Sequence, residues 1–198
     1  FKEITGHDRL EEILEGMLVC AKAGFESIKI NTVLLKGMND GEVDDFISFT
    51  ETNPVSLRFI ELMRTGNNAD YFKTHHLAGN VVRERLLARG WNLKPREDGA
   101  GPADVYEKLG YKGTIGLIAP YSKDFCKTCN RLRISARGQL QLCLFGEGGH
   151  NLRPLLQEDR QMEELQERVM SLLRIKKETH FLHDGLTGAT PHLASIGG

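Results

Sequence analysis

The hydrophobic pattern of the first 70 residues alternates between helical and strand spacing. Apolar residues recur every three or four positions over residues 10–21, which predicts an amphipathic helix that ends at Gly24. Residues 27–35 and 55–63 have the mixed apolar character of strands, and residues 42–51 between them predict a second helix. Helix, strand, helix and strand in this order are typical of α/β proteins with parallel sheets or barrels.

The pattern changes after a Gly- and Asn-rich break at residues 65–71, which is a candidate domain boundary. Residues 77–89 predict an amphipathic helix, and residues 105–109 and 113–119 predict short strands. The chain is largely helical again from residue 151 onward. We therefore expect a second part that mixes short strands with helices.

Composition places the chain among ordinary globular proteins. It has 198 residues and a net charge of −1, so no general attraction to nucleic acid is expected. No stretch approaches the roughly 20 apolar residues of a membrane span, and no secretory signal is visible. Cysteine is sparse and clustered, which favours a reducing, cytoplasmic compartment. The sequence starts at Phe1 in the middle of an apparent element, so we expect a fragment of a longer protein.

Three cysteines form the main chemical signal. Two residues separate Cys126 from Cys129, and thirteen separate Cys129 from Cys143. Thiolates in this arrangement suit zinc or an iron–sulfur cluster; because structural zinc normally needs four ligands, either a distant residue completes the site or one position stays open. The competing interpretations are small core residues, or a redox dithiol that leaves Cys143 unexplained. Cys20 lies near the apolar stripe of the first helix and is expected to be a buried core residue.

The register of a predicted hairpin decides what faces Cys143. Residues 130–135 and 139–145 read as its strands. A three-residue loop at 136–138, with its glycine in the left-handed conformation, would place Cys143 opposite Arg131.

The alternative is a two-residue loop, which would set Cys143 opposite Leu132 and turn Arg131 and Arg133 away. We favour the three-residue loop, because it puts both arginines on the face of Cys143. A cationic face beside a metal site has an obvious use.

Other candidates carry weaker signals from the residues alone. Met63 stands at the C-terminal end of a strand, where barrels place their chemistry, but core packing is its simpler interpretation. For Lys29, within the first strand, a solvated charge is the simpler interpretation. Residues 183–198 lack periodicity and read as a disordered tail, although Gly197 and Gly198 would allow close backbone approach to a ligand.

The cysteine segment also carries a family resemblance. Cys126-Lys-Thr-Cys-Asn-Arg-Leu-Arg-Ile-Ser and Gly138-Gln-Leu-Gln-Leu-Cys-Leu-Phe-Gly-Glu closely resemble the MoaA family. These are GTP 3′,8-cyclases, radical S-adenosylmethionine (SAM) enzymes of molybdenum cofactor biosynthesis. The bacterial members are the most similar, and segments of similarity run along the whole chain: Phe1-Lys-Glu-Ile-Thr-Gly, Ile28-Lys-Ile-Asn, Lys36-Gly-Met-Asn-Asp, Leu57-Arg-Phe-Ile-Glu-Leu-Met, Phe145-Gly-Glu-Gly-Gly and Ile196-Gly-Gly.

The resemblance implies a fold and a division into domains. The family's radical-SAM motif, Cys-x-x-x-Cys-x-x-Cys, is absent, so the chain resembles the C-terminal portion of a member. Residues 1–70 would be the last strands and helices of an incomplete (β/α) barrel. Residues 71–198 would be an α+β domain that binds an iron–sulfur cluster and GTP and ends in a Gly-Gly tail.

The resemblance also implies site residues. Cys126, Cys129 and Cys143 would hold a second [4Fe–4S] cluster, whose fourth iron is open to the purine of GTP. Guanidinium groups suit phosphate oxygens, and lysine supplies a point charge. The residues implied to bind GTP are Lys29, Arg58, Arg131, Leu132 and Arg133.

The implied activity belongs to a complete enzyme. Met63 matches a methionine that contacts SAM, and Gly197 and Gly198 match a tail that enters the active site. The other [4Fe–4S] cluster, in the missing half, would cleave SAM to a radical that converts GTP to 3′,8-cyclo-GTP, so this half alone is expected to be inactive. The full-length enzyme is expected to be a homodimer that passes its product to the cyclic pyranopterin monophosphate synthase. The alternatives are a zinc-binding interaction module and the auxiliary-cluster domain of another radical-SAM enzyme.

Overall fold

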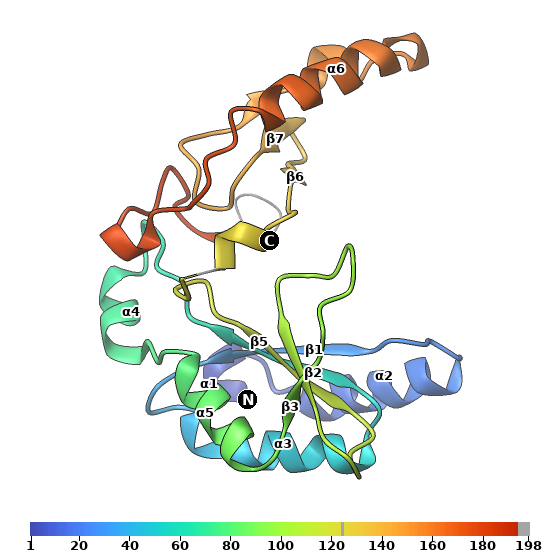
Figure 1. Cartoon of the computed structure of the whole chain (residues 1–198), viewed down its shortest axis with the longest axis vertical. Helices are drawn as coiled ribbons and strands as arrows, with labels where there is room; N and C mark the ends of the chain where they lie inside the picture. The colour runs from blue at the N-terminus through green and yellow to red at the C-terminus, as the bar shows by residue number, and fades with distance from the viewer. Residues whose placement is uncertain (124, 194–198) are drawn as a thin grey trace.

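The computed structural model describes residues 1–123 and 125–193, in two parts stacked along the long axis (Figure 1). The helices are α1 (Lys2–Thr5), α2 (Leu10–Lys22), α3 (Val43–Thr52), α4 (Ala69–His75), α5 (Asn80–Ala88) and α6 (Met162–Leu173). The strands are β1 (Lys29–Leu34), β2 (Ser56–Glu61), β3 (Asn92–Leu93), β4 (Asp104–Glu107), β5 (Thr114–Ile118), β6 (Arg133–Ile134), β7 (Gln139–Gln141) and β8 (His150–Asn151). Short 3₁₀ turns are η1 (Asp40–Glu42), η2 (Phe125–Thr128), η3 (Arg153–Leu155), η4 (Asp159–Gln161) and η5 (Leu182–Asp184).

The larger part is built on a mixed sheet with strand order β1-β2-β5-β4-β3. Strands β1, β2 and β5 are parallel, whereas β4 and β3 continue the sheet in antiparallel fashion. Helix α3 connects β1 to β2, which makes a β-α-β unit of the kind that the sequence pattern predicted. The mixed α/β class is therefore confirmed.

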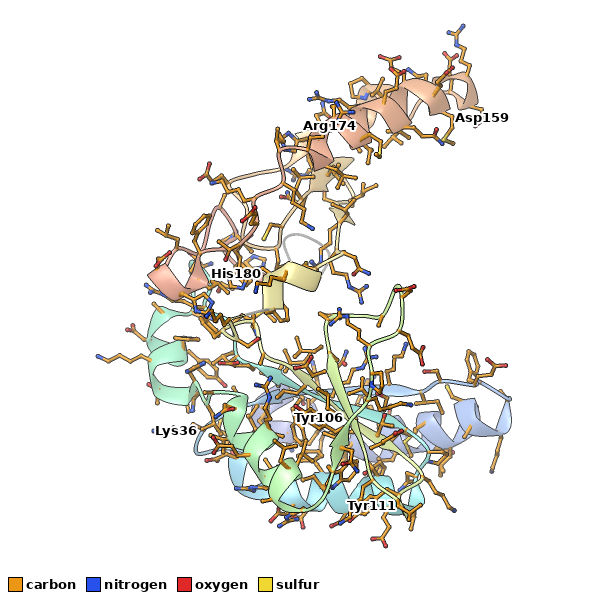
Figure 2. The ribbon with its side chains drawn as sticks, viewed as in Figure 1. Lys36, Tyr106, Tyr111, Asp159, Arg174 and His180 are labelled. Atoms are coloured by element: carbon orange, nitrogen blue, oxygen red, sulfur yellow. The ribbon has the colours of Figure 1, made fainter. Side chains whose placement is uncertain are left out.

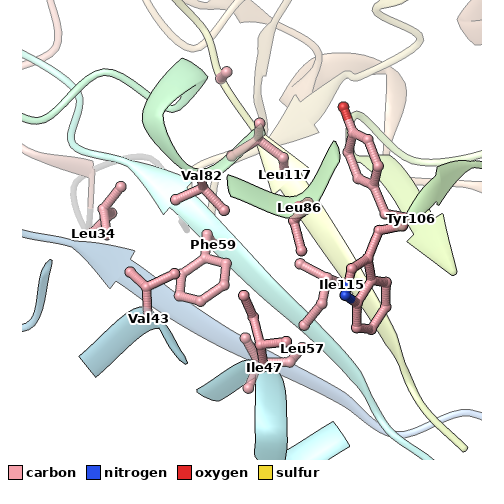
Figure 3. Close-up of a cluster of buried hydrophobic side chains, with 12 residues drawn as sticks. Leu34, Val43, Ile47, Leu57, Phe59, Val82, Leu86, Tyr106, Ile115 and Leu117 are labelled. Atoms are coloured by element: carbon pink, nitrogen blue, oxygen red, sulfur yellow. The ribbon is translucent and has the colours of Figure 1, made fainter. Parts of the chain in front are cut away.

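One face of this sheet packs against α3 and α5 (Figure 3). Strand β2 shows the alternation that a half-buried strand requires, because Leu57, Phe59 and Glu61 are buried and the residues between them are partly exposed. The buried side chains join those of the two helices, among them Ile47 of α3 and Leu86 of α5. The opposite face, here called the open face, carries Ser56, Arg58 and Ile60 of β2, which are partly exposed.

The sheet crosses the boundary expected at residue 70. Strands β1 and β2 precede that residue, and β3 to β5 follow it. The predicted break at residues 65–71 contains the start of α4 at Ala69. The assignment of residues 1–70 to a barrel and of residues 71–198 to a cluster domain stays a prediction.

Helix α2 matches its predicted bounds but is not packed as expected. It is followed by Gly24, which has the left-handed φ of 82°. None of its residues is buried, and Cys20 is only partly covered. The prediction that Cys20 is a buried core residue is therefore wrong, because the apolar stripe of α2 packs under no described segment. Within the described residues, no helix is long and apolar enough to cross a membrane.

The smaller part holds the antiparallel sheet β6-β7-β8 and helix α6. Leu140, Leu152 and Leu172 form its buried centre. Leu165 and Val169 pack against this centre, so one apolar face of α6 covers the small sheet. This part carries the three clustered cysteines.

Candidate functional site

The hairpin that returns Cys143 has the three-residue loop predicted from the sequence. Arg133 pairs with Gln141, and the Ser135 amide donates to the Gln139 carbonyl oxygen at 3.0 Å. Gly138 closes the loop with a φ of 71°. This register is the favoured one, since its continuation sets Arg131 opposite Cys143.

The strands of this hairpin are shorter than predicted. Strand β6 is limited to Arg133 and Ile134, and β7 ends at Gln141, so Arg131 and Cys143 lie beyond the ladder. Arg133 is half-buried, and Leu132 is 37% exposed. That both arginines face Cys143 stays a prediction.

The three clustered cysteines are free thiols of intermediate exposure. Cys126 lies on η2, and the Cys129 amide donates to its carbonyl oxygen at 3.1 Å, which closes the loop between them. Burial raises the pKa of the Cys143 thiol, and the neighbouring Cys126 and Cys129 raise it further, whereas Lys176 opposes these effects. The three thiols are thus close enough to act on one another electrostatically.

No three His, Cys, Asp or Glu side chains of the described residues are gathered closely enough to hold a single metal ion. A cubane cluster binds each thiolate to a different iron, so its ligands lie farther apart than the ligands of one ion. Three thiolates are donors that iron–sulfur clusters accept, and a cluster held by these cysteines stays a prediction.

Arg131 extends from the cysteine segment to the loop between β3 and β4. A Cβ atom on Gly101 would lie 2.7 Å from an Nη atom of Arg131, so the guanidinium rests against that glycine. The Asn130 side chain donates to the Ala100 carbonyl oxygen at 3.4 Å in the same region. These contacts join the cysteine segment to the edge of the large sheet.

Arg58 projects from the open face of the large sheet toward the same region. Its alkyl chain lies over Gly116, its register neighbour on β5, where a Cβ atom would approach Arg58 Cγ to 2.8 Å. Burial lowers the pKa of Arg58, and the positive charge of Arg131 lowers it further. The Nε atom of Arg58 is buried and has no hydrogen-bond partner among the described residues.

Lys29 belongs to the same open face. It starts β1 opposite Ser56, and Asn31, two residues on, is the register partner of Arg58. Since side chains two residues apart share a face of the sheet, Lys29 and Arg58 lie on the same side. The structure thus brings Lys29, Arg58 and Arg131 to one side of the sheet.

Met63 follows β2 and is partly buried. Its carbonyl oxygen accepts a 2.9 Å hydrogen bond from the Asn68 side chain, which fixes the turn after the strand. Strand β2 ends at Glu61, so Met63 lies two residues beyond the C-terminal end of this parallel strand and not within it as predicted.

Residues 188–191, here called the C-terminal segment, lie between the turn at residues 63–68 and the loop at residues 143–146, here called the Cys143 loop. The Thr190 hydroxyl donates to the Leu144 carbonyl oxygen at 2.7 Å, and the Ala189 amide donates to that of Gly146 at 2.9 Å. On the other side, the Gly66 amide donates to the Thr190 carbonyl oxygen at 3.1 Å. The segment therefore bridges the two parts, while Gly197 and Gly198 lie outside the described residues.

Three residues at this site were not identified from the sequence. The Lys176 ammonium donates to the carbonyl oxygens of Cys129 and Arg131, although no motif includes this lysine. Gly188 and Gly101 lie in Gly-rich loops, where the sequence gives no sign of which glycine meets another segment. Only the tertiary contacts single these residues out.

Comparison with known proteins gives this geometry a family context. Residues 55–182 match the family model described as Molybdenum Cofactor Synthesis C. All 198 residues align with a protein named GTP 3′,8-cyclase from Stenotrophomonas maltophilia (strain K279a), at 54% identity over 61% of that protein's length. Proteins of the same name from Tolumonas auensis and Vibrio cholerae (strain ATCC 39315) are 55% and 51% identical, and the chain covers 59% of each.

The chain thus spans about three-fifths of the length of the curated relatives that it matches, at 59–61%. The matched family region contains β2, Arg58, the three clustered cysteines and helix α6. From both observations, the chain belongs to the Molybdenum Cofactor Synthesis C family.

Proposed function

We propose that this chain is a portion of a GTP 3′,8-cyclase that holds GTP beside an auxiliary [4Fe–4S] cluster. The name of the relatives, GTP 3′,8-cyclase, supports GTP as the substrate. The family description supports a place in molybdenum cofactor synthesis. The cysteine segment and the adjacent cationic residues supply the chemistry for the two ligands.

Cys126, Cys129 and Cys143 are the residues that would hold the cluster. They are free thiols, partly shielded from solvent and within electrostatic reach of one another. Three thiolates leave one iron of a [4Fe–4S] cluster without a protein ligand, and such an iron can accept a nitrogen or oxygen atom of a substrate. The part played by the protein is to fix the three sulfur ligands and to shape the space beside them.

The proposal that GTP binds here rests on two arginine side chains, those of Arg58 and Arg131. Within residues 1–123 and 125–193, no ion pair or side-chain hydrogen bond reaches the guanidinium groups of Arg58 and Arg131, although the two repel each other. Two neighbouring guanidinium groups of this kind are stabilised when an anion such as a triphosphate binds between them. Lys29 on the same face would add a third positive charge, and Arg133 and Leu132 would extend the contact along the hairpin.

Binding of GTP to Arg131→Met tests this assignment. Each charged phosphate contact contributes about 1.5–3 kcal/mol, so the Kd for GTP should rise by at least about tenfold in isothermal titration. Arg137→Met, at the exposed tip of the hairpin loop, is the control and should bind GTP as the unaltered chain does. Equal affinities for the two variants would refute the role of Arg131.

The remaining assignments extend to the whole enzyme. Met63 would contact SAM at the end of β2, and Gly197 and Gly198 would enter the active site. SAM cleavage would require a further cluster outside this sequence, so the chain alone should neither consume SAM nor form 3′,8-cyclo-GTP. In the complete enzyme we expect a homodimer whose product passes to the cyclic pyranopterin monophosphate synthase.

A further inference from the structure

Lys176 occupies a position that the proposed roles do not yet use. It lies three residues beyond α6, in the segment that runs from Arg174 down to His180 at the junction of the two parts (Figure 2). Its half-buried ammonium donates to the carbonyl oxygen of Cys129 at 3.2 Å and to that of Arg131, also at 3.2 Å. One cation therefore holds both ends of the tripeptide that joins a proposed cluster ligand to a proposed phosphate ligand.

This tripeptide needs such an anchor because it lies outside regular structure. Strand β6 begins only at Arg133, so the carbonyl oxygens of Cys129 and Arg131 take no part in the sheet. A hydrogen bond from a charged donor is stronger than one from a neutral donor; the bond to Cys129 is partly buried, and the bond to Arg131 is exposed. The Lys176 ammonium satisfies both groups and fixes the backbone on either side of Asn130.

We infer that Lys176 is a positioning residue. It fixes the loop of Cys126 and Cys129, the proposed cluster ligands, relative to Arg131, the proposed phosphate ligand. The inference rests on the proposed function, since it concerns the cluster and GTP. Without Lys176, Cys129 and Arg131 would each gain freedom, and the cluster and GTP would both be held less tightly. The ammonium also places a positive charge beside the thiolates, which favours the more negative, reduced state of a cluster.

Lys177 supplies a matched control at the next position. Its ammonium pairs with the exposed carboxylate of Glu147 at 3.0 Å and lies over the ring of Phe181. Among the described residues, its ammonium makes no hydrogen bond to the backbone of residues 126–133. Replacing Lys177 removes the same charge from the same stretch of chain but leaves the carbonyl contacts in place.

The test compares Lys176→Met, Lys176→Arg and Lys177→Met after anaerobic reconstitution with iron and sulfide. Iron per chain after gel filtration, the cluster's reduction potential and the Kd for GTP are measured in each. Lys176→Met should lose at least half of its iron, shift the potential to more negative values and weaken GTP binding about tenfold. Lys176→Arg keeps the charge and can reach both carbonyl oxygens, so it should restore most of each property, and Lys177→Met should match the unaltered chain.

The outcomes separate this inference from the proposed function. If the unaltered chain takes up iron and binds GTP, but Lys176→Met behaves as Lys177→Met does, the positioning role is wrong and the proposed function stands. If the unaltered chain takes up no iron and binds no GTP, the proposed function fails and the inference fails with it. A loss in Lys176→Met that Lys176→Arg does not restore would also overturn the inference, because both contacts require only a charged donor. Circular dichroism of each variant identifies any loss that comes from unfolding.

Discussion

At the scale of single residues, Gly188 shows how the C-terminal segment depends on close backbone approach. Its φ of 61° is left-handed, and a Cβ atom there would overlap the carbonyl oxygens of Phe145 and Gly146. The next residue, Ala189, donates its amide to the Gly146 carbonyl oxygen at 2.9 Å. Only glycine allows this segment to lie against the Cys143 loop.

Gly188→Ala should therefore destabilise the chain. The control is Gly90→Ala, because Gly90 has a comparable φ of 77° and open space where its Cβ would be. Left-handed backbone alone should cost about 1 kcal/mol in the control, and the overlap at Gly188 should cost about 1–3 kcal/mol more. The free energy of unfolding in urea measures both, and equal losses would show that the close approach is not required.

His180 gives the stability a pH dependence. It is 6% exposed, its Nε2 atom lies 2.9 Å from the Pro120 carbonyl oxygen, and its Nδ1 atom accepts the Leu182 amide at 3.1 Å. Protonation would turn Nδ1 into a donor facing another donor. Burial lowers the pKa of His180, and the neighbouring His183 lowers it further.

The unfolded chain therefore binds a proton at His180 before the folded chain does. This contribution to stability is complete above the unfolded pKa of about 6.5 and is lost as the pH falls toward the lower folded value. The free energy of unfolding should decline as the pH drops from about 7 to 5, and His180→Gln should flatten that decline. The exposed His7→Gln is the control; a decline of unchanged slope in His180→Gln would contradict the assignment.

At the scale of elements, the cysteine hairpin separates what local sequence determines from what packing determines. The loop at residues 136–138 and its register were predictable, because a left-handed glycine at a fixed position selects one hairpin closure. The lengths of the strands could not be predicted. Strand β6 begins only after the residues that Lys176 contacts, and β7 ends before the loop that the C-terminal segment contacts. The positions of β1, β2 and α3 followed from periodicity alone.

The tail is the element whose two interpretations differ most. In the described segment before it, Thr190 and Ala189 donate hydrogen bonds to the carbonyl oxygens of Leu144 and Gly146, in the loop that follows Cys143. Deleting Gly197 and Gly198 from the full-length enzyme, or introducing Gly197→Val, should reduce product formation at least about tenfold, or ~1.4 kcal/mol in the barrier. Iron content should not change. Full turnover of the deletion variant at saturating SAM and GTP would contradict entry of the tail into the active site and favour a disordered tail.

At the scale of the whole molecule, the open face of the large sheet is where prediction from sequence reached its limit. Periodicity indicates that Lys29 and Arg58 lie on strands, but only the pairing β1-β2-β5 puts them on one face. The approach of Arg131 to Arg58 joins segments 73 positions apart, and no local pattern encodes it. The prediction that Cys20 is buried was wrong for the same reason, because the apolar stripe of a helix does not reveal whether another segment covers it.

The central claim is that Cys126, Cys129 and Cys143 hold an iron–sulfur cluster beside a nucleotide site. Iron, sulfide and zinc analysis of the anaerobically reconstituted chain, with Cys143→Ser and Cys20→Ser alongside, tests it most directly. We expect about one [4Fe–4S] cluster per chain, lost for the most part in Cys143→Ser and kept in Cys20→Ser. One zinc without sulfide, as a zinc-binding interaction module would show, or equal loss of iron in both variants, would contradict it.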